Sequence, residues 1–417
     1  MTKGNGLSPF RWLIVLAIIP IIISTEMMWL SLAPISSMAE NYYGVGGMSI
    51  ALFSMSYMIM YIIFSVPASW IVDKYGFRYS LIIGAAITAV FGLVRALFAN
   101  NFTIVLTAQF MIAVGQPFLL NISTKVPANW FPVSERSTAA GLLTMAQYIG
   151  FALPMVLAPV LAGSKGIPYT LMVFAVIGIL SALCAILFTR ERPRVALSGP
   201  EAPREDLSFA AIKNLFLNKA FLLVLYICLI SMGIFNTILT LIEQILLPRG
   251  IATAQAGIVG AVFVISGVIG AVILPIISDR LGKRTPFFVT AIALLIPVYL
   301  GLTFLDTFVL VAILAGIAGF SIMGVAPVLF QHGSEVAYPI QEGTSLGIIL
   351  LMGQISGALF VYLFELFQSV TASVTWPMLG IVVLTAAVLP AALRIKESKL
   401  VKQSEAFAAQ QKAINPH

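Results

Sequence analysis

The chain of 417 residues is 60% hydrophobic and only 9% charged, and its formal net charge is +7. Soluble domains carry roughly a quarter charged residues, so most of this surface must face something other than water. The sequence has two histidines and no CxxC, HExxH or nucleotide-binding loop, so it predicts no metal centre, no cofactor and no enzyme.

Apolar runs separated by proline, glycine and charged residues predict helices along the whole chain. Each run is long enough to cross a bilayer core of about 30 Å. The first run has about 25 residues and no small-residue cleavage site, so we expect it to stay in the protein. The twelve predicted helices cover residues 12–37, 48–72, 79–99, 103–128, 137–162, 168–189, 219–247, 254–277, 286–305, 308–335, 343–368 and 373–393.

The basic residues gather on one side of these helices. If the N-terminus is cytoplasmic, the inner segments hold 20 Lys and Arg residues, and only Arg95, Lys165 and Arg249 remain for the outer side. The positive-inside rule then places both termini in the cytoplasm. The basic charge reflects this topology, so no nucleic-acid partner is expected. We expect a multi-pass monomer in the cell (cytoplasmic) membrane, surrounded by lipid.

Two pairs of similar motifs link the halves of the chain. "DKYGFR" (73–78) follows the second helix, and "DRLGKR" (279–284) follows the eighth, 206 residues later. "FPVSERST" (131–138) precedes the fifth helix, and "YPIQEGTS" (338–345) precedes the eleventh, 207 residues later. Six plus six helices with this duplication form the major facilitator architecture.

The predicted fold is therefore an all-α membrane protein with two pseudo-symmetric six-helix bundles. The N-terminal bundle covers 1–189 and the C-terminal bundle covers 219–396. Between them lies a cytoplasmic linker, 190–218, whose last part can form an amphipathic interfacial helix. A cytoplasmic tail covers 397–417.

The loops after the second and eighth helices resemble the facilitator signature G-x-x-x-D-x-x-G-R-[KR], although the first copy lacks the leading glycine. Glycine allows the sharp turn, and an acid beside bases pairs with them or with a helix N-terminus. The resemblance implies a network that holds the cytoplasmic side closed. A basic turn without a gating role is the alternative. The matching residues are Asp73, Gly76 and Arg78 in the first copy, and Asp279, Gly282 and Arg284 in the second.

A second inner gate is predicted around the segment between the fourth and fifth helices. Lys125 and Arg136 frame this segment, Glu135 lies between them, and Glu342 occurs in the repeat. These side chains can form salt bridges. Ordinary anchoring by positive residues explains them equally well.

The stretch "GQPFLLNISTKVPANWFPVSERSTAAG" (115–141) resembles the feline leukaemia virus subgroup C receptor-related transporters, solute carrier family 49. Further matches are Trp29, "TLIEQIL" (240–246), "EGTS" (342–345) and Gln354. The resemblance implies a carrier of small organic molecules, because members are linked to choline and ethanolamine, to haem and to pyridoxine-like vitamins. In choline-type members, an aromatic pair and two glutamines surround the ammonium group.

Trp29, Gln116 and Gln354 match those positions. The second aromatic residue is replaced by Asn236, which argues against choline itself because a two-ring cage is the basis of quaternary ammonium recognition. Asn121, Tyr57 and Gln147 are further candidate substrate contacts. Interhelical hydrogen bonding or packing is the alternative for all of these polar residues.

Glu26 lies near the middle of the first predicted helix, three residues before Trp29 and on the same face. A charged carboxylate there costs about 2.5–3.5 kcal/mol on insertion scales, so such residues usually face a cavity or a partner. Glu26 is predicted to be a counter-charge for a cation, a proton-coupling site, or both. A structural carboxyl group, neutral or paired with Arg95, is the alternative. Glu243 is either a second counter-charge or part of an outer gate, or else a solvated helix end.

The sequence thus predicts a secondary active or facilitative transporter of a small organic solute, cationic or zwitterionic, that works by alternating access. The substrate gradient or protons supply the energy, and Glu26 carries the proton or balances the substrate charge. A multidrug/proton antiporter, a haem or porphyrin carrier, and a transport-dead receptor on the same fold are the alternatives.

Overall fold

The structure is a computed structural model that describes residues 10–131, 133–191, 215–337 and 342–397. The regular elements in these ranges are helices, and 11 helical stretches are long and apolar enough to cross a membrane. One of them, Thr138–Phe188, has 51 residues and divides at Gly166, where φ is 83° and ψ is 174°. A left-handed turn of this kind favours glycine. The all-α membrane fold predicted from the sequence is confirmed.

The described chain forms two compact units, which are described separately. The first unit comprises residues 1–204, 239–247 and 252–261, and the second comprises 205–238, 248–251 and 262–417. Residues 239–247 and 252–261 follow the linker in the sequence, yet they group with the first unit.

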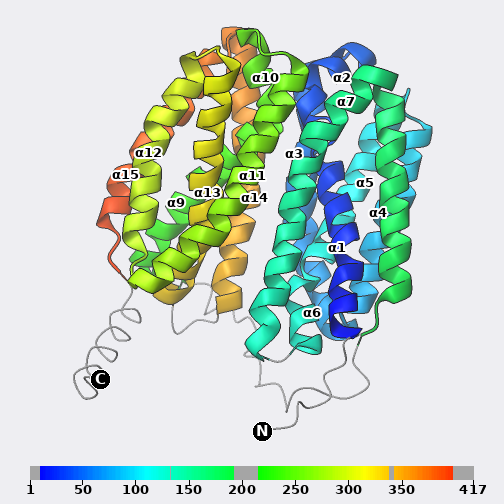
Figure 1. Ribbon diagram of the computed structural model, residues 1–417, viewed down its shortest axis with the longest axis horizontal. Coiled ribbons are helices and arrows are strands. Elements are labelled where there is room, and N and C mark those ends of the chain that lie inside the picture. Colours follow the sequence, from blue (N-terminus) through cyan, green and yellow to red (C-terminus); the bar gives the residue numbers. More distant parts are fainter. Residues whose placement is uncertain (1–9, 132, 192–214, 338–341, 398–417) are drawn as a thin grey trace. The chain divides into compact units, whose positions relative to one another are not determined.

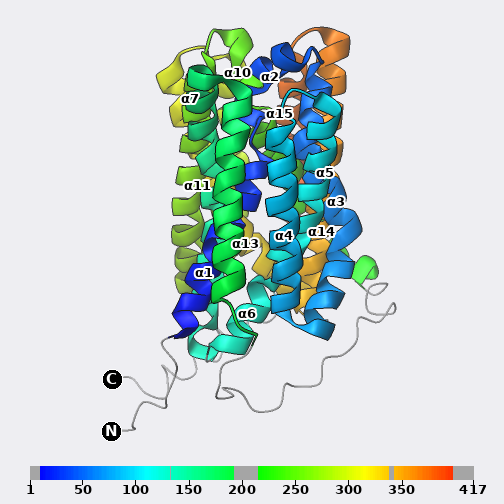
Figure 2. The same cartoon turned by 90° about the vertical axis from the view of Figure 1, so that its right-hand side faces the viewer.

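The first unit is built mainly from the helices that precede the linker (Figure 1), with two segments that follow it. Its elements are α1 (Phe10–Trp29), η1 (Ala33–Ile35), α2 (Ser36–Tyr43), α3 (Gly47–Tyr75), α4 (Phe77–Leu97), α5 (Phe102–Leu120), α6 (Ile122–Trp130), α7 (Val133–Phe188), α10 (Ile242–Leu246) and the first part of α11 (Thr253–Leu281). Helix α1 packs along α7, and α4 lies between α5 and α7. Short helices α2 and α10 meet at one end of this unit (Figure 2).

The second unit contains the remaining long helices. They are α9 (Lys219–Thr240), the rest of α11, α12 (Thr285–Phe304), α13 (Phe308–Ala337), α14 (Glu342–Thr371) and α15 (Thr375–Arg394), with the short η2 (Leu247–Arg249). Helix α12 packs against α13 and α15, and α13 packs against α14.

Three of the predicted helices are interrupted. The first ends at Trp29, and the chain continues through η1, which has Pro34 in its first turn. The fourth breaks at Asn121, directly after a turn that contains Pro117. The seventh breaks at Leu241, whose backbone (φ −108°, ψ 19°) is not helical. These breaks leave backbone groups and polar side chains free for other contacts.

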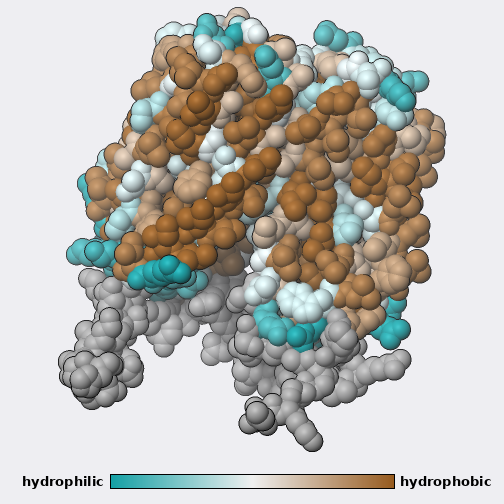
Figure 3. Space-filling view, in the orientation of Figure 1, coloured by the Kyte–Doolittle hydropathy of each residue, from teal (hydrophilic) through white to brown (hydrophobic). Residues whose placement is uncertain are grey.

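Large hydrophobic side chains cover the flanks of the helices, as the brown surface in Figure 3 shows. Val66, Leu187 and Val370 are examples of such exposed residues. Exposed apolar surface on this scale is what a lipid-facing protein requires. The interior of the first unit contains one cluster around Ile18, Phe77 and Trp130 and another around Phe53 and Phe174.

Candidate functional site

Glu26 and Gln116 form the buried polar centre of the first unit. Glu26 lies on α1 and is 1% exposed, and Gln116 lies on α5 and is 6% exposed. The Gln116 amide nitrogen donates to both carboxylate oxygens of Glu26, at 3.0 and 3.2 Å. No salt bridge joins Glu26 to a described basic residue, and the Gln116 Oε1 atom has no described partner. The centre therefore presents acceptor oxygens.

A close approach of two helices fixes the position of Glu26. Gly150 on α7 lies against α1, and a Cβ atom at this position would be 2.6 Å from the Glu26 Cβ atom and 2.9 Å from the Ile23 carbonyl oxygen. Real Cβ atoms do not come so close, so the helices can meet here only because residue 150 is glycine.

Aromatic rings gather one helical turn beyond Glu26. The Trp29 ring packs edge-to-face on Phe151 at 5.1 Å and lies 6.4 Å from the Tyr57 ring. The Trp29 indole nitrogen donates to the Ser54 carbonyl oxygen at 2.9 Å, and the Tyr57 hydroxyl donates to the Thr25 carbonyl oxygen at 3.0 Å. Backbone carbonyls thus orient both predicted residues. Phe151 was not predicted, because nothing in an apolar helix indicates which phenylalanine faces a polar centre.

Arg95 is separate from this centre. It is fully buried on α4, and its Nη1 atom donates to the Met28 carbonyl oxygen at 3.4 Å, to the Ser31 hydroxyl at 3.1 Å and to the Gln109 side-chain oxygen. Gln109 in turn donates to the Met28 and Phe53 carbonyl oxygens. The predicted alternative of an Arg95–Glu26 ion pair is therefore not formed in this structure.

Asn121 joins α3 to the break between α5 and α6. Its side-chain nitrogen donates to the Ser65 carbonyl oxygen and to the Ser69 hydroxyl, each at 2.9 Å. Its side-chain oxygen accepts from the Tyr61 hydroxyl at 3.2 Å. These three hydrogen bonds fix the junction between α5 and α6 against α3.

The remaining three predicted substrate contacts have no hydrogen bond to Glu26 among the described residues. Gln147 is half-buried on α7 in the first unit. Asn236 is buried on α9 in the second unit, and its side chain donates to the Met232 carbonyl oxygen at 3.0 Å. Gln354 is half-buried on α14, next to Gly353, which packs against the Met232 side chain. Asn236 and Gly353 therefore both contact Met232.

Glu243 is a fully buried carboxylate in the first turn of α10. It accepts hydrogen bonds from the Ser36 hydroxyl at 2.8 Å, from the Ser37 backbone nitrogen at 2.8 Å and from the Ser37 hydroxyl at 2.6 Å. The Thr253 hydroxyl at the start of α11 donates at 2.7 Å. All four donors are uncharged. Glu243 thus links the beginning of α2 to the beginning of α11.

The first signature loop is closed by several polar contacts. Asp73 forms an ion pair with Lys125 of α6, at 3.6 Å. The backbone nitrogens of Phe77 and Arg78 donate to the Glu191 carboxylate at 3.2 and 2.7 Å. Gly76 has φ of 96°, and a Cβ atom there would overlap the Glu191 carboxylate at 2.4 Å, which explains the glycine.

A second ion pair lies nearby, where Arg11 at the start of α1 meets Glu135 at the start of α7, at 3.0 Å. The side chains of the other two predicted gating residues, Arg136 and Glu342, lie outside the described part of the structure.

The second signature loop repeats the arrangement. Gly282 has φ of 62°, and Arg284 pairs with Asp279 and, at 3.1 Å, with Glu335 of α13. Partial burial alone would lower the pKa of Arg284, but its bonds to these two carboxylates raise it, so the guanidinium stays charged. The backbone nitrogens of Arg284 and Thr285 donate to the Glu397 carboxylate, at 2.8 to 3.1 Å.

Sequence reasoning missed Glu191 and Glu397, although a signal for them existed. The two residues are 206 apart, the same spacing as the two loop motifs. A carboxylate at a helix N-terminus accepts its free N–H groups and favours the positive end of the helix dipole. Each repeat thus uses the residues after its last helix to cap its third helix.

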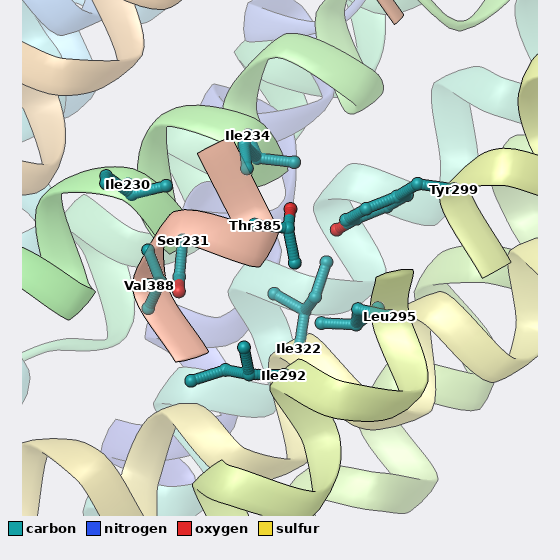
Figure 4. A pocket seen from close by; sticks show the side chains of 9 residues that line it. All are labelled: Ile230, Ser231, Ile234, Ile292, Leu295, Tyr299, Ile322, Thr385 and Val388. Atoms are coloured by element: carbon teal, nitrogen blue, oxygen red, sulfur yellow. The ribbon is translucent and has the colours of Figure 1, made fainter. Parts of the chain in front are cut away.

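A small cavity lies inside the second unit, among α9, α12, α13 and α15 (Figure 4). Its atom-free space is about 260 Å³, part of which is open to the outside, and the hydroxyls of Ser231, Tyr299 and Thr385 face an otherwise aliphatic lining. None of the predicted substrate contacts lines it. It is therefore distinct from the centre around Glu26.

The family of this chain is shown by a match over most of its length. The model of the Major Facilitator Superfamily matches residues 8–361, which is most of the chain. The chain belongs to the Major Facilitator Superfamily. This superfamily member is thus a multi-pass membrane transporter of a small solute, as the duplication of the loop motifs predicts.

The curated relatives confirm the resemblance to solute carrier family 49. "Solute carrier family 49 member A3" of Xenopus tropicalis is 27% identical to this facilitator over 379 residues, which cover 85% of this chain and 77% of that protein. "Choline/ethanolamine transporter FLVCR1" of Felis catus is 27% identical over 378 residues, covering 85% and 67%. "Choline/ethanolamine transporter FLVCR2" of Homo sapiens is 28% identical over 374 residues, covering 84% and 70%.

A solved structure supports the same fold for this facilitator. A bacterial homologue of the human lysosomal transporter Spinster, in an inward-facing and unoccupied conformation, superimposes with a TM-score of 0.74. The match covers 93% of this chain and 97% of that one, at 15% sequence identity. At this identity the likeness shows the fold alone.

Proposed function

We propose that this facilitator carries a small organic amine across the membrane by alternating access, and that Glu26 binds the cargo, a proton, or each in turn. The supporting observation is the Glu26 carboxylate itself. It is buried on α1, against α5 and α7, and among the described residues it accepts only from Gln116. A carboxylate in such a place must be neutral or must meet a positive charge, and a cationic cargo supplies one.

The acceptor atoms favour one kind of ammonium group. The Glu26 oxygens and the unpartnered Gln116 Oε1 atom all accept hydrogen bonds. A primary or secondary amine can donate to such atoms, whereas a quaternary ammonium cannot. The Trp29 ring, one turn away, adds a cation–π surface. FLVCR1 and FLVCR2 are named as choline/ethanolamine transporters, and of these two chemistries the ethanolamine type fits Glu26 and Gln116 better.

The remaining polar contacts supply candidate gates. We propose that the ion pairs Asp73–Lys125, Arg11–Glu135 and Arg284–Glu335 steady the ends of the helices that close the cytoplasmic side. Glu243 is proposed to serve the opposite end, because its four hydrogen bonds fasten α10 and α11 to Ser36 and Ser37.

Transport in proteoliposomes tests the role of Glu26. If Glu26 carries the proton, Glu26→Gln abolishes uptake of a labelled amine driven by a pH gradient, while exchange of amine across the membrane continues. If Glu26 binds only the cargo, both processes fall together. The exposed Asp306 between α12 and α13 offers a control, and Asp306→Asn should leave both processes unchanged. Unchanged pH-driven uptake by Glu26→Gln would refute the proposal, and absence of flux of any amine would point to a receptor.

A further inference from the structure

The Arg95 guanidinium leaves most of its donors unused. Arg95 is fully buried on α4, and within the described part of the chain only its Nη1 atom has hydrogen-bond acceptors. Its Nε and Nη2 atoms are buried and have no partner among the described residues. Because buried N–H groups are almost always paired, three unpaired N–H bonds on one side chain require an explanation.

The charge of Arg95 is also unbalanced at close range. The three acceptors, from Met28, Ser31 and Gln109, are all neutral. No described carboxylate forms a salt bridge with Arg95. A guanidinium removed from water without a counter-charge is strongly unfavourable. The Gln109 side chain cannot rotate to accept from the remaining Arg95 donors, because its amide nitrogen is bonded to two backbone carbonyl oxygens.

Tyr43 contributes a second unused donor to the same region. Its hydroxyl is buried without a described partner, and Tyr43 packs against the buried cluster that contains Ala96, the residue next to Arg95. The Tyr43 ring packs at a tilt against Phe102, at the start of α5, with 5.5 Å between the ring centroids. Tyr43 is half-buried and is the last residue of α2.

The available groups are thus donors around a single positive charge. We propose that Arg95 and Tyr43 bind a small monovalent anion, with chloride as the expected ligand. One negative charge neutralises the guanidinium, and a halide accepts several hydrogen bonds at once. The site joins the end of α1 to α4 and α5 through Met28, Ser31 and Gln109. This inference goes beyond the proposed transport activity and does not depend on it.

Thermal unfolding of the purified full chain tests the site, with chloride replaced by gluconate at constant ionic strength. Binding to the folded state raises the Tm as the ligand concentration rises. We expect a saturable increase of Tm with chloride, and we expect Arg95→Gln to remove it. Tyr43→Phe should raise the half-saturating chloride concentration by about fivefold or more, since a fold-change of this size corresponds to one lost hydrogen bond. The matched control is Arg11→Gln, which should keep the native chloride dependence because Arg11 pairs with Glu135.

Several outcomes would overturn the proposal. If the Tm of the native protein does not respond to chloride, the charge of Arg95 is compensated without an anion. If Arg95→Gln keeps the response, chloride binds at another place. If Arg95→Gln does not fold, Arg95→Lys and Tyr43→Phe serve instead, and an unchanged half-saturating concentration in both would also refute the site. Acetate in place of chloride tells whether the same donors accept a carboxylate.

Discussion

Glu191 and Glu397 lie 206 residues apart and cap equivalent helices in the two units. The Glu191 carboxylate accepts from the first backbone nitrogens of α4, and the Glu397 carboxylate does the same for α12. The duplication of the sequence therefore extends beyond the two loop motifs to the segment that follows each set of helices.

Replacing either carboxylate should destabilise its own unit. Glu191→Ala and Glu397→Ala each remove the acceptor of backbone N–H groups, and we expect each to lower the free energy of unfolding by about 0.5–2 kcal/mol. Thermal melts in detergent measure the effect. Asp306→Ala, at an exposed acid without such bonds, should change it by less than about 0.5 kcal/mol. Equal melting temperatures for all three variants would contradict the capping role.

A methyl group at residue 150 should separate α1 from α7. Gly150→Ala places a Cβ atom against Glu26 and the Ile23 carbonyl, and we expect a loss of about 1–3 kcal/mol in the free energy of unfolding together with weaker amine binding. Gly163, on the same α7 helix, has open space around it. Gly163→Ala should therefore keep native binding and stability, or gain up to about 1 kcal/mol. Similar losses in both variants would show that helix propensity, not the contact with Glu26, is responsible.

Removing the Glu243 carboxylate should loosen one end of the first unit. Glu243→Ala leaves the donors of Ser36, Ser37 and Thr253 without their acceptor, at a cost of about 1–3 kcal/mol. Hydrogen exchange of residues 36–43 and 242–249 should then accelerate by about tenfold or more. Glu40→Gln is the control, because Glu40 is half-buried and accepts one longer bond, 3.3 Å, from Gln244. Unchanged exchange in Glu243→Ala would remove Glu243 from the proposed gate.

The Trp29 ring should contribute to the binding of organic cations. Trp29→Ala removes the ring and should weaken amine affinity by about 0.5–2 kcal/mol, whereas Trp29→Phe should retain part of it. Isothermal titration with the purified protein measures the affinity. Trp376, which is exposed on α15, provides the control, and Trp376→Ala should bind as the native protein does. Native affinity in Trp29→Ala would place the ring outside the binding region.

Long apolar runs and repeated motifs were readable from the sequence because they depend on composition and spacing. Twelve predicted helices and the duplicated loops follow from such signals, and the superfamily match confirms the fold. The breaks near Ser31, Asn121 and Leu241 were less visible. A helix can end before its apolar run does, since membrane depth constrains hydrophobicity more than backbone geometry.

Side-chain neighbours were harder to predict for a related reason. In a helix that is apolar on every side, periodicity does not tell which face meets which neighbour. The sequence therefore indicated that Glu26 and Arg95 are unusual. It did not indicate that Gln116 forms hydrogen bonds with Glu26, or that Gln109 forms one with Arg95. Gly150 and Phe151 were overlooked because their importance lies only in what α1 brings against them.

Residues 239–247 and 252–261 belong to the first unit, although they follow the linker. A gene divided at the linker would therefore yield two fragments that are each incomplete. The N-terminal fragment would keep Ser36 and Ser37 without Glu243, and the C-terminal fragment would carry Glu243 and Thr253 without their docking surface. Such fragments are suited to complementation when they are produced together, and a single half is a poor candidate for expression by itself.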